Sequence, residues 1–520
     1  MVRVNRIEKA ARLNRDELFR FGSALLFIIG IMLFAVVRTD DSTHSILLVI
    51  AAMIGGYMAM NIGANDVANN IGPAVGSHAI TLTGAIVIAV IFEASGAIIA
   101  GGDVVGTIKK GIIDPSAVAD PDTFIWMMIA ALLAAALWLN TATALGAPVS
   151  TTHSIVGGVL GAGIAAGGIG IADWEVVGKI AASWVISPVL GGLIAATFLY
   201  LIKRTITYQD NVMAAARRVV PLLVAVMAWA FATYLMLKGV KQLYKFSFQS
   251  AALIGLAVAI ATYFLVRPRT RRLAERLENR KESVNDLFTI PLIFAAAMLS
   301  FAHGANDVAN AVGPLAGVNE VIATGEVTIK AGIPLWVMLV GAIGISLGLA
   351  LYGPKLIRTV GSEITELDRM RAFCIAMSAA ITVIAASQLG LPVSSTHIAV
   401  GGVFGVGFLR EHLKTRYALM IDEIRDHHRD SDPEELEEFL QRFEAASITH
   451  KGDILRSLKA QTGDKLLRKA ERKGLGRLHR LELVKRSLLL LIVLAWLVTV
   501  PVSGIMGAMF FFMLRGMFLP

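Results

Sequence analysis

Long apolar stretches follow one another along almost the whole chain. Many of them approach the ~20 residues that a helix needs to cross ~30 Å of hydrocarbon. The stretches are 22–37, 46–62, 126–146, 180–202, 219–238, 250–266, 288–302, 334–352, 372–392 and 487–514. An outer-membrane barrel would instead show alternating segments of ~10 residues, and the sequence has none. The pattern predicts an all-α polytopic membrane protein with about 11 to 13 transmembrane segments.

Two polar phrases interrupt the apolar pattern, and each is written twice. Gly-Ala-Asn-Asp-Val-Ala-Asn begins at residue 63 and again at 304, 241 positions later. Pro-Val-Ser-(Ser/Thr)-Thr-His begins at 148 and again at 392, 244 positions later. The nearly equal offsets indicate that one long unit was duplicated. Interrupted helices in corresponding halves of a membrane chain point to a transporter site. We therefore expect inverted-topology repeats with broken helices or re-entrant hairpins.

The first phrase places several polar side chains in an apolar setting. Carboxylates and carboxamides are costly in hydrocarbon unless they are satisfied, and their oxygens together suit a hard cation. Glycine and proline are expected to unwind the helix here and free carbonyl oxygens. Interhelical hydrogen bonding is the alternative role, but duplication of the phrase favours a cation site. The polar residues are Asn65, Asp66, Asn69 and Asn70, and the helix breakers are Gly63, Gly72 and Pro73.

The second phrase resembles the start of a helix. Proline suits the first turn, and hydroxyl side chains cap free backbone N–H groups. A helix N-terminus attracts anions, and hydroxyls add donors to an oxyanion. Ordinary capping is the alternative. The hydroxyl residues are Ser150, Thr151 and Thr152 in the first copy and Ser394, Ser395 and Thr396 in the second. We interpret His153 and His397 as packing residues rather than proton carriers.

Together the two phrases predict cation-coupled anion transport. Neither phrase contains Arg or Lys, so an oxyanion near Asp66 and Asp307 would be repelled unless a bound cation reversed the local charge. Glu93, on another apolar stretch, is expected to be a coupling-ion or proton site, or else to pair with a neighbouring helix. A Ser-His-Asp hydrolase is disfavoured because a nucleophile is needed once, whereas this arrangement is doubled. A passive channel is a third class, which accumulation of anion against its gradient would exclude.

Composition agrees with a membrane protein. The 520 residues are 56% hydrophobic and 17% charged, with a mean hydropathy of +0.67. The net charge of +9 follows from Lys and Arg in loops, as the positive-inside rule expects, and does not require a nucleic-acid partner. Basic residues before 22–37 predict an uncleaved first helix with a cytoplasmic N-terminus. The single Cys374 excludes an intrachain disulfide.

The charge pattern also divides the chain. Residues 411–480 are rich in charge and predict a solvated, cytoplasmic helical insertion, with a regulatory or docking role as the alternative. The predicted units are 1–45, a basic N-terminus with an extra helix; 46–202, repeat 1; 203–285, a connecting helix pair with basic cytoplasmic loops; 286–410, the first part of repeat 2; 411–480, the insertion; and 481–520, the final transmembrane region.

At these residues the chain resembles the inorganic phosphate transporter (PiT) family. Both phrases are signatures of that family, and the similarity covers about 46–410 and 480–515. It extends to Ile91-Phe92-Glu93, to 107–114, to 183–188, to Ser300-Phe301-Ala302-His303 and to 500–504.

The resemblance implies symport of inorganic phosphate with sodium or protons through a multi-pass protein of the inner or plasma membrane. Substrate and cations would meet near the midplane. By motif position, the coupling cation would be served by Asn65, Asp66, Asn69, Asn306, Asp307 and Asn310, together with Glu93. The anion would be held by Ser150, Thr151, Thr152, Ser394, Ser395 and Thr396. Asp66 and Asp307 would contact either the cation or protonated phosphate. No cofactor and no enzymatic activity are implied, and a homodimer is possible for such folds.

Three features depart from the family pattern. They are the extra helix at 22–37, the long insertion, and Ala376 or Met377 where many members carry a glutamate. We expect this missing glutamate to leave Glu93 without a partner from the other repeat. The choice between sodium and proton, and between phosphate and sulfate, therefore stays open from the sequence.

Overall fold

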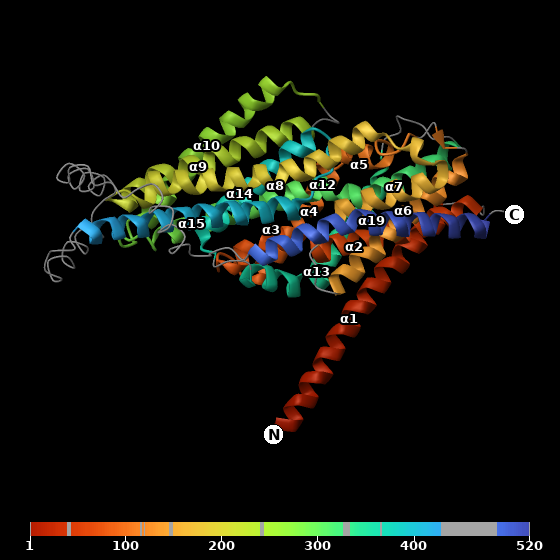
Figure 1. Cartoon of the computed structure of the whole chain (residues 1–520), viewed down its shortest axis with the longest axis horizontal. Helices are drawn as coiled ribbons and strands as arrows, with labels where there is room; N and C mark the ends of the chain where they lie inside the picture. The colour runs from red at the N-terminus through yellow and green to blue at the C-terminus, as the bar shows by residue number, and fades with distance from the viewer. Residues whose placement is uncertain are drawn as a thin grey trace.

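The computed structural model is a bundle of helices (Figure 1). It describes residues 2–38, 43–114, 117–118, 120–144, 149–239, 244–325, 333–363, 367–427 and 486–518. In these ranges 11 helices are long and apolar enough to cross a membrane. The only pairing of extended backbone there is one bridge between Ile113 and Ala172. The predicted all-α polytopic fold is therefore confirmed.

The helices fall into two corresponding series. The first series comprises α2 (Thr43–Asn65), α3 (Val67–Gly76), α4 (Leu82–Ala100), α5 (Gly102–Lys110), α6 (Pro121–Ala144), α7 (Thr151–Gly167) and α8 (Trp174–Ile202). The connecting elements are α9 (Val212–Tyr234), α10 (Phe248–Ala274) and α11 (Val284–Leu287). The second series comprises α12 (Thr289–Thr324), α13 (Leu335–Glu363), α14 (Arg369–Gln388), α15 (Ser395–His427) and α19 (Arg486–Phe518). Helix α1 (Val2–Val37) precedes both.

Each series packs against the other through equivalent glycines. A methyl group added at Gly63 on α2 would overlap the carbonyl of Ile345 on α13, and one added at Gly304 on α12 would overlap the carbonyl of Glu93 on α4. Such a reciprocal exchange of contacts indicates a two-fold relation between the units. Helices α7 and α15 each start within a copy of the second phrase, and they lead towards opposite ends of the bundle (Figure 1).

The same reciprocity joins the second pair of helices. A methyl group at Gly161 on α7 would overlap the carbonyl of Gly504 on α19, and one at Gly405 on α15 would overlap that of Gly192 on α8. Small residues allow helix backbones to approach this closely where the surrounding lipid gives no hydrophobic drive.

The glycines and prolines of the first phrase do not unwind the helices as the sequence suggested. Gly72 and Pro73 lie inside α3, and α12 runs unbroken through the second copy with Pro314 inside it. Within the two copies of this phrase, the helix is interrupted at Asp66 alone, and the backbone there keeps helical angles (φ −79°, ψ −34°). That prediction was wrong: Gly63 and Gly304 serve close helix contacts, and Gly72 and Pro73 are accommodated within a buried helix.

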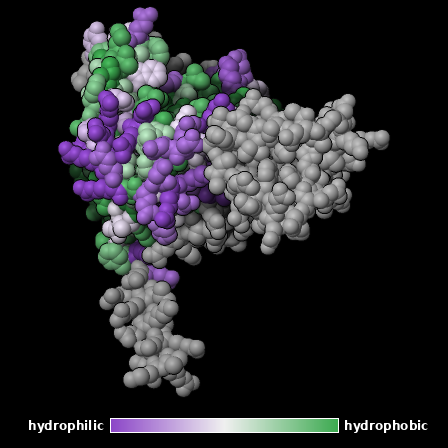
Figure 2. All heavy atoms as spheres, turned by 90° about the vertical axis from the view of Figure 1, so that its left-hand side faces the viewer, coloured by the Kyte–Doolittle hydropathy of each residue, from purple (hydrophilic) through white to green (hydrophobic). Residues whose placement is uncertain are grey.

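Polar residues gather at one end of the bundle. Figure 2 shows hydrophilic side chains over the left-hand end of Figure 1, where α15 continues past the predicted unit boundary at 410 to His427. Most of the predicted insertion, from 428 onward, lies outside the described residues. Helix α1 leaves the bundle at an angle (Figure 1) and carries exposed apolar side chains such as Phe21, Leu26 and Leu33.

The glycine contacts predict a strong effect of one methyl group. Gly161→Ala should destabilise the folded protein by about 1–3 kcal/mol, because overpacking a close contact forces backbone shifts. Gly178→Ala on α8, where an added methyl group has nothing within 4 Å, is the matched control and should be neutral. Thermal unfolding in detergent, followed by size-exclusion chromatography, compares the two variants. Equal melting temperatures for both variants would contradict the packing argument.

Candidate functional site

The two copies of the second phrase start helices at the centre of the bundle. Ser150 caps α7, its Oγ accepting from the backbone N–H of His153 at 3.2 Å. Ser394 does the same for α15, with a distance of 3.3 Å to the backbone nitrogen of His397. These bonds confirm the predicted helix starts. A serine at the N-cap satisfies a backbone N–H that the helix itself leaves unpaired.

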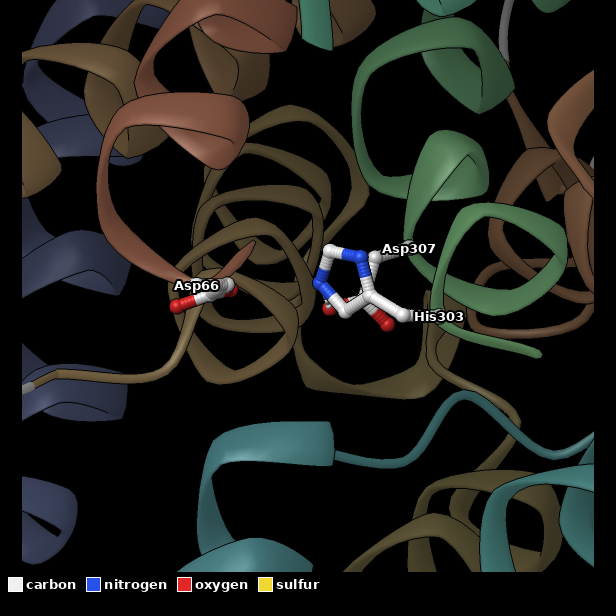
Figure 3. A group of neighbouring side chains, drawn as sticks. All are labelled: Asp66, His303 and Asp307. Atoms are coloured by element: carbon white, nitrogen blue, oxygen red, sulfur yellow. Dashed lines mark ion pairs between the residues drawn. The ribbon is translucent and has the colours of Figure 1, made fainter. Parts of the chain in front are cut away.

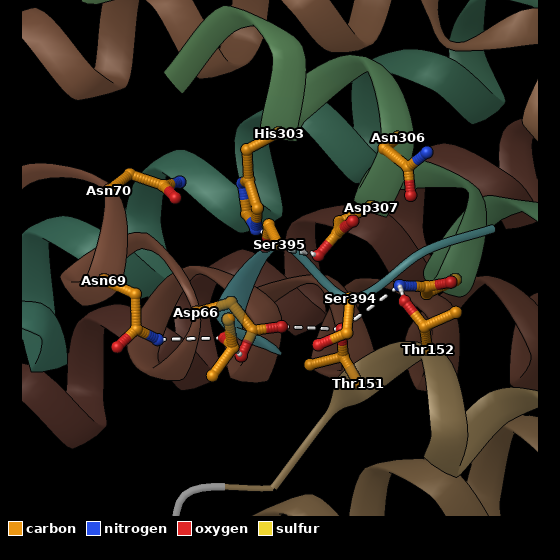
Figure 4. A network of polar contacts seen from close by, with 12 residues as sticks. Asp66, Asn69, Asn70, Thr151, Thr152, His303, Asn306, Asp307, Ser394 and Ser395 are labelled. Carbon is orange, nitrogen blue, oxygen red and sulfur yellow. Dashed lines mark hydrogen bonds and ion pairs between the residues drawn. The ribbon is translucent and has the colours of Figure 1, made fainter. Parts of the chain in front are cut away.

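The carboxylate of Asp66 joins both copies of the second phrase. Thr151 donates its hydroxyl to Asp66 Oδ2 at 2.6 Å, and Thr396 donates to Oδ1 at 3.2 Å (Figure 4). All three residues are buried. Thr151 and Thr396, which are 245 positions apart in the chain, therefore meet on one carboxylate, where the two repeats cross.

The carboxamides extend the same network across the repeats. Asn69 donates to Thr396 Oγ1 at 2.9 Å. Its counterpart Asn310 donates to the hydroxyls of Thr151 and Thr152, both at 3.1 Å. Each first phrase thus contacts the second phrase of the other half, and Asn310 bridges two hydroxyls.

Asp307 lies opposite Asp66. One ligand atom each from Asp66, His303 and Asp307 lies within 4.8 Å of the others (Figure 3). Ser395 donates to Asp307 Oδ2 at 3.4 Å, and His303 Nε2 lies 3.0 Å from the same oxygen. The structure brings both predicted aspartates together with the predicted hydroxyl residues.

Asn65 and Asn306 lie at the edge of this cluster. Asn65 donates to Thr143 Oγ1 at the end of α6, at 2.7 Å. Asn306 donates to Ser387 Oγ at the end of α14, at 3.0 Å, and accepts from the backbone N–H of Val393 at 3.3 Å. Asn306 thereby holds the segment that leads from α14 into the second copy, and Asn65 contacts the end of α6.

Glu93 is paired with neighbouring helices. Its Oε1 accepts from Asn70 Nδ2 at 3.0 Å, and its Oε2 lies 2.6 Å from His303 Nδ1. All three side chains are buried. Sequence reasoning gave no role to His303, although its position four residues before Asp307 put both on one face of a helix.

The counterpart of Glu93 is not Ala376. Gly304 contacts the Glu93 backbone as Gly63 contacts that of Ile345, so the equivalent position lies on α13. Ala376 lies on α14, the helix that precedes the second copy of the phrase as α6 precedes the first. Ile345, not Ala376 or Met377, stands at the position equivalent to Glu93. Glu93 does have a partner from the other series, His303, contrary to the expectation that it would have none.

Several buried oxygens in this cluster have no hydrogen-bond partner among the residues that the structure describes. They are Oδ1 of Asp307, Oδ1 of Asn310 and Oδ1 of Asn70. Buried polar atoms are usually satisfied, and carboxylate and carboxamide oxygens are the ligands that hard cations prefer. The donor set is therefore of the kind that hard cations prefer.

The two histidines of the second phrase pack together beneath the cluster. The His153 and His397 rings stack with centroids 4.5 Å apart. The ring of Trp184 meets that of His153 edge-on, with centroids 3.7 Å apart, and the ring of Trp496 stacks on that of His397, with centroids 3.5 Å apart. This agrees with their predicted packing role.

Comparison with known proteins places this arrangement in a family. A model described as "Phosphate transporter family" matches residues 62–507. A Helicobacter pylori protein named "Putative phosphate permease" is 53% identical over 98% of this chain and 97% of its own length. A Pyrococcus horikoshii relative of the same description is 40% identical over 70% of this chain and 89% of its own.

A solved structure is also similar. It is named "The sodium-dependent phosphate transporter", and it superposes with a TM-score of 0.73 at 34% identity over 91% of this chain and all of its own. The Helicobacter relative aligns along nearly the whole chain, so its similarity includes the region of α1 and the charged segment. On these grounds the chain belongs to the phosphate transporter family.

Proposed function

We propose that this protein imports inorganic phosphate across the inner or plasma membrane, coupled to a cation for which sodium is the first candidate. Membership of the family supports phosphate as substrate. The similar solved structure, which is named as sodium-dependent, supports sodium. Three buried oxygens without a hydrogen-bond partner in the described ranges, one from Asp307 and two from asparagines, supply suitable cation ligands.

The observation that carries the coupling is the pair of hydroxyl bonds to Asp66. A hydroxyl has one proton to donate, so Thr151 and Thr396 each serve either the carboxylate or an anion. A cation bound to Asp66 replaces these donors and releases them towards phosphate. Cation binding then raises anion affinity, and by linkage the anion raises cation affinity by the same factor.

Charge favours the same order of events. Asp66, Asp307 and Glu93 are buried in a protein that spans a membrane, where unpaired charge is expensive. Phosphate arriving alone would meet carboxylates, whereas bound cations reverse the local field. The capped N-termini of α7 and α15 then present backbone N–H groups and partial positive charge to the anion.

Phosphate suits this site better than sulfate. Near neutral pH phosphate keeps a proton, so it can donate to Asp66 or Asp307, and sulfate cannot. Asn69 and Asn310 already bond to the threonine hydroxyls and would orient them towards either ligand. Sulfate is therefore expected to compete weakly.

The polar end of the bundle is proposed to face the cytoplasm. Arg204, Arg217, Arg218 and Arg271 lie at the ends of α8 to α10 on that side, and basic residues favour the cytoplasmic side of a membrane. We assign the N-terminus and the charged segment to the same side.

Removal of sodium tests the coupling. In proteoliposomes that contain the purified protein, uptake of labelled phosphate should stop when external sodium is replaced by choline, because Asp66 then retains both hydroxyls. Excess sulfate, with sodium present, should inhibit by less than about half. Uptake that survives both sodium removal and collapse of the proton gradient would refute cation coupling.

A hydroxyl deletion tests the competition at Asp66. Thr151→Val should raise the phosphate KM by about tenfold, since a hydrogen bond to a charged group contributes about 1.5–3 kcal/mol and tenfold corresponds to about 1.4 kcal/mol. The dependence of phosphate KM on sodium should also weaken, while Thr151→Ser keeps both properties.

Thr197→Val, which removes an exposed hydroxyl on α8 that bonds only the Leu193 carbonyl, is the matched control for the KM measurement. A Thr151→Val protein with an unchanged phosphate KM at every sodium concentration would count against this role of the hydroxyl.

A further inference from the structure

The two halves of the site are not chemically equivalent. The glycine contacts equate Glu93 with Ile345, and the phrase register equates His303 with Ile62 and Asn70 with Ala311. One half therefore carries a hydrogen-bonded polar arm, whereas the other half is apolar at each corresponding position. The six buried residues are Asn70, Glu93 and His303 on the polar side and Ala311, Ile345 and Ile62 on the apolar side.

The two aspartates differ accordingly. Asp66 accepts from two threonine hydroxyls, one from each repeat. Asp307 accepts from one hydroxyl, that of Ser395, and its other neighbour is His303. The equivalent of Thr396 is Thr152, whose hydroxyl donates instead to the Val393 carbonyl at 3.0 Å. No described residue donates to Oδ1 of Asp307, where a second hydroxyl would complete the symmetry, and His303 lies instead against Oδ2, the oxygen that Ser395 contacts.

Both oxygens of Glu93 are engaged by protein. Asn70 donates to one, and His303 lies against the other. Asp307, by contrast, has no partner for Oδ1 among the described residues, because His303 and Ser395 both lie against Oδ2. The arm therefore occupies both oxygens of the glutamate and leaves one oxygen of the aspartate available for a ligand.

We propose that His303 is a positioning residue that ties Asp307 to Glu93 and so sets the affinity of the Asp307 half for the coupling cation. Glu93 acts on the cation through His303 and not as a ligand. The two halves then bind cations with different affinities, and the Asp66 half depends on hydroxyls alone. This inference rests on the proposed sodium-coupled function.

Energetics support a role beyond packing. A carboxylate buried inside a membrane protein is expensive, and a buried ion pair often stabilises a fold no better than apolar residues of similar volume. The equivalent positions in the other half hold the buried residues Ile62 and Ile345, which shows that this fold accepts apolar side chains at these places. The polar arm therefore calls for a functional explanation.

The test replaces residues of the polar arm, and for His303 it introduces the isoleucine found at the equivalent position 62. His303→Ile, Glu93→Gln and the double variant are reconstituted in proteoliposomes, and labelled phosphate uptake is measured against sodium and against phosphate. His303→Ile should raise the half-saturating sodium concentration by about tenfold or more, as expected for the loss of a charge-assisted contact. The phosphate KM at saturating sodium should change less than about threefold.

Two further variants separate positioning from folding. His303→Gln keeps a buried polar side chain with N–H donors on a single nitrogen, enough to hold one of the two carboxylates, and should therefore raise the half-saturating sodium concentration less than His303→Ile does. Ile62→Leu, a volume-conserving change at the equivalent position, should leave sodium and phosphate dependence within about twofold. If His303→Ile does not fold, His303→Ala, which also removes both ring nitrogens, replaces it in the cycle with Glu93→Gln.

The double variant decides whether Glu93 acts through His303. If it does, the double variant should be no worse than His303→Ile alone, because coupled residues are not additive. The inference would be overturned if the increases in half-saturating sodium concentration of the two single variants multiplied in the double variant. It would also be overturned if His303→Ile folded and kept its sodium affinity. Failure of the proposed function is seen separately, as sodium-independent uptake by the unmodified protein, and it would overturn both.

Discussion

The cost of burying carboxylates in a membrane protein governs this structure. Asp66 and Asp307 lie inside the bundle with almost no exposed surface, and neither contacts a Lys or Arg in the described residues. Their partners are hydroxyls and an imidazole, which leave negative charge to be balanced. Under the proposed function, a cation that arrives and departs balances this charge. The helix starts at Ser150 and Ser394 would then serve an anion only when that cation is present.

Close crossing of the two repeats makes this cluster possible. Gly63 and Gly304 let α13 and α4 approach at backbone distance, so that each first phrase reaches the second phrase of the other unit. A side chain at these positions would separate the helices and draw Asp66 away from Thr396. The close packing of the two repeats therefore also positions the hydrogen bonds from Thr151 and Thr396 to Asp66, on which the proposed coupling depends. A change between inward-facing and outward-facing states by rocking of the repeats would alter both together.

Local features were predictable from the sequence, and features that join distant segments were not. The helix starts at Ser150 and Ser394 follow from capping, which needs only a few neighbouring residues. The expectation that Gly72 and Pro73 would unwind the helix was wrong, because tertiary packing satisfies that segment as a helix. His303 was missed because its partner Glu93 lies 210 positions away, and a single histidine has no periodic pattern. The pairing of Asp66 with Thr396 likewise depends on how the repeats cross.

Duplication alone would give two equivalent cation sites, and equivalent sites leave the order of binding undefined. The polar arm of Asn70, Glu93 and His303 occurs on one side only, against Ala311, Ile345 and Ile62 on the other. Since His303 occupies one flank of Asp307 while two hydroxyls serve Asp66, the carboxylates present different fields to the same ion. A difference of about 1.4 kcal/mol between them separates the affinities tenfold, which suffices to make one half fill first. Divergence of a few buried residues can therefore give a symmetric fold an ordered transport cycle.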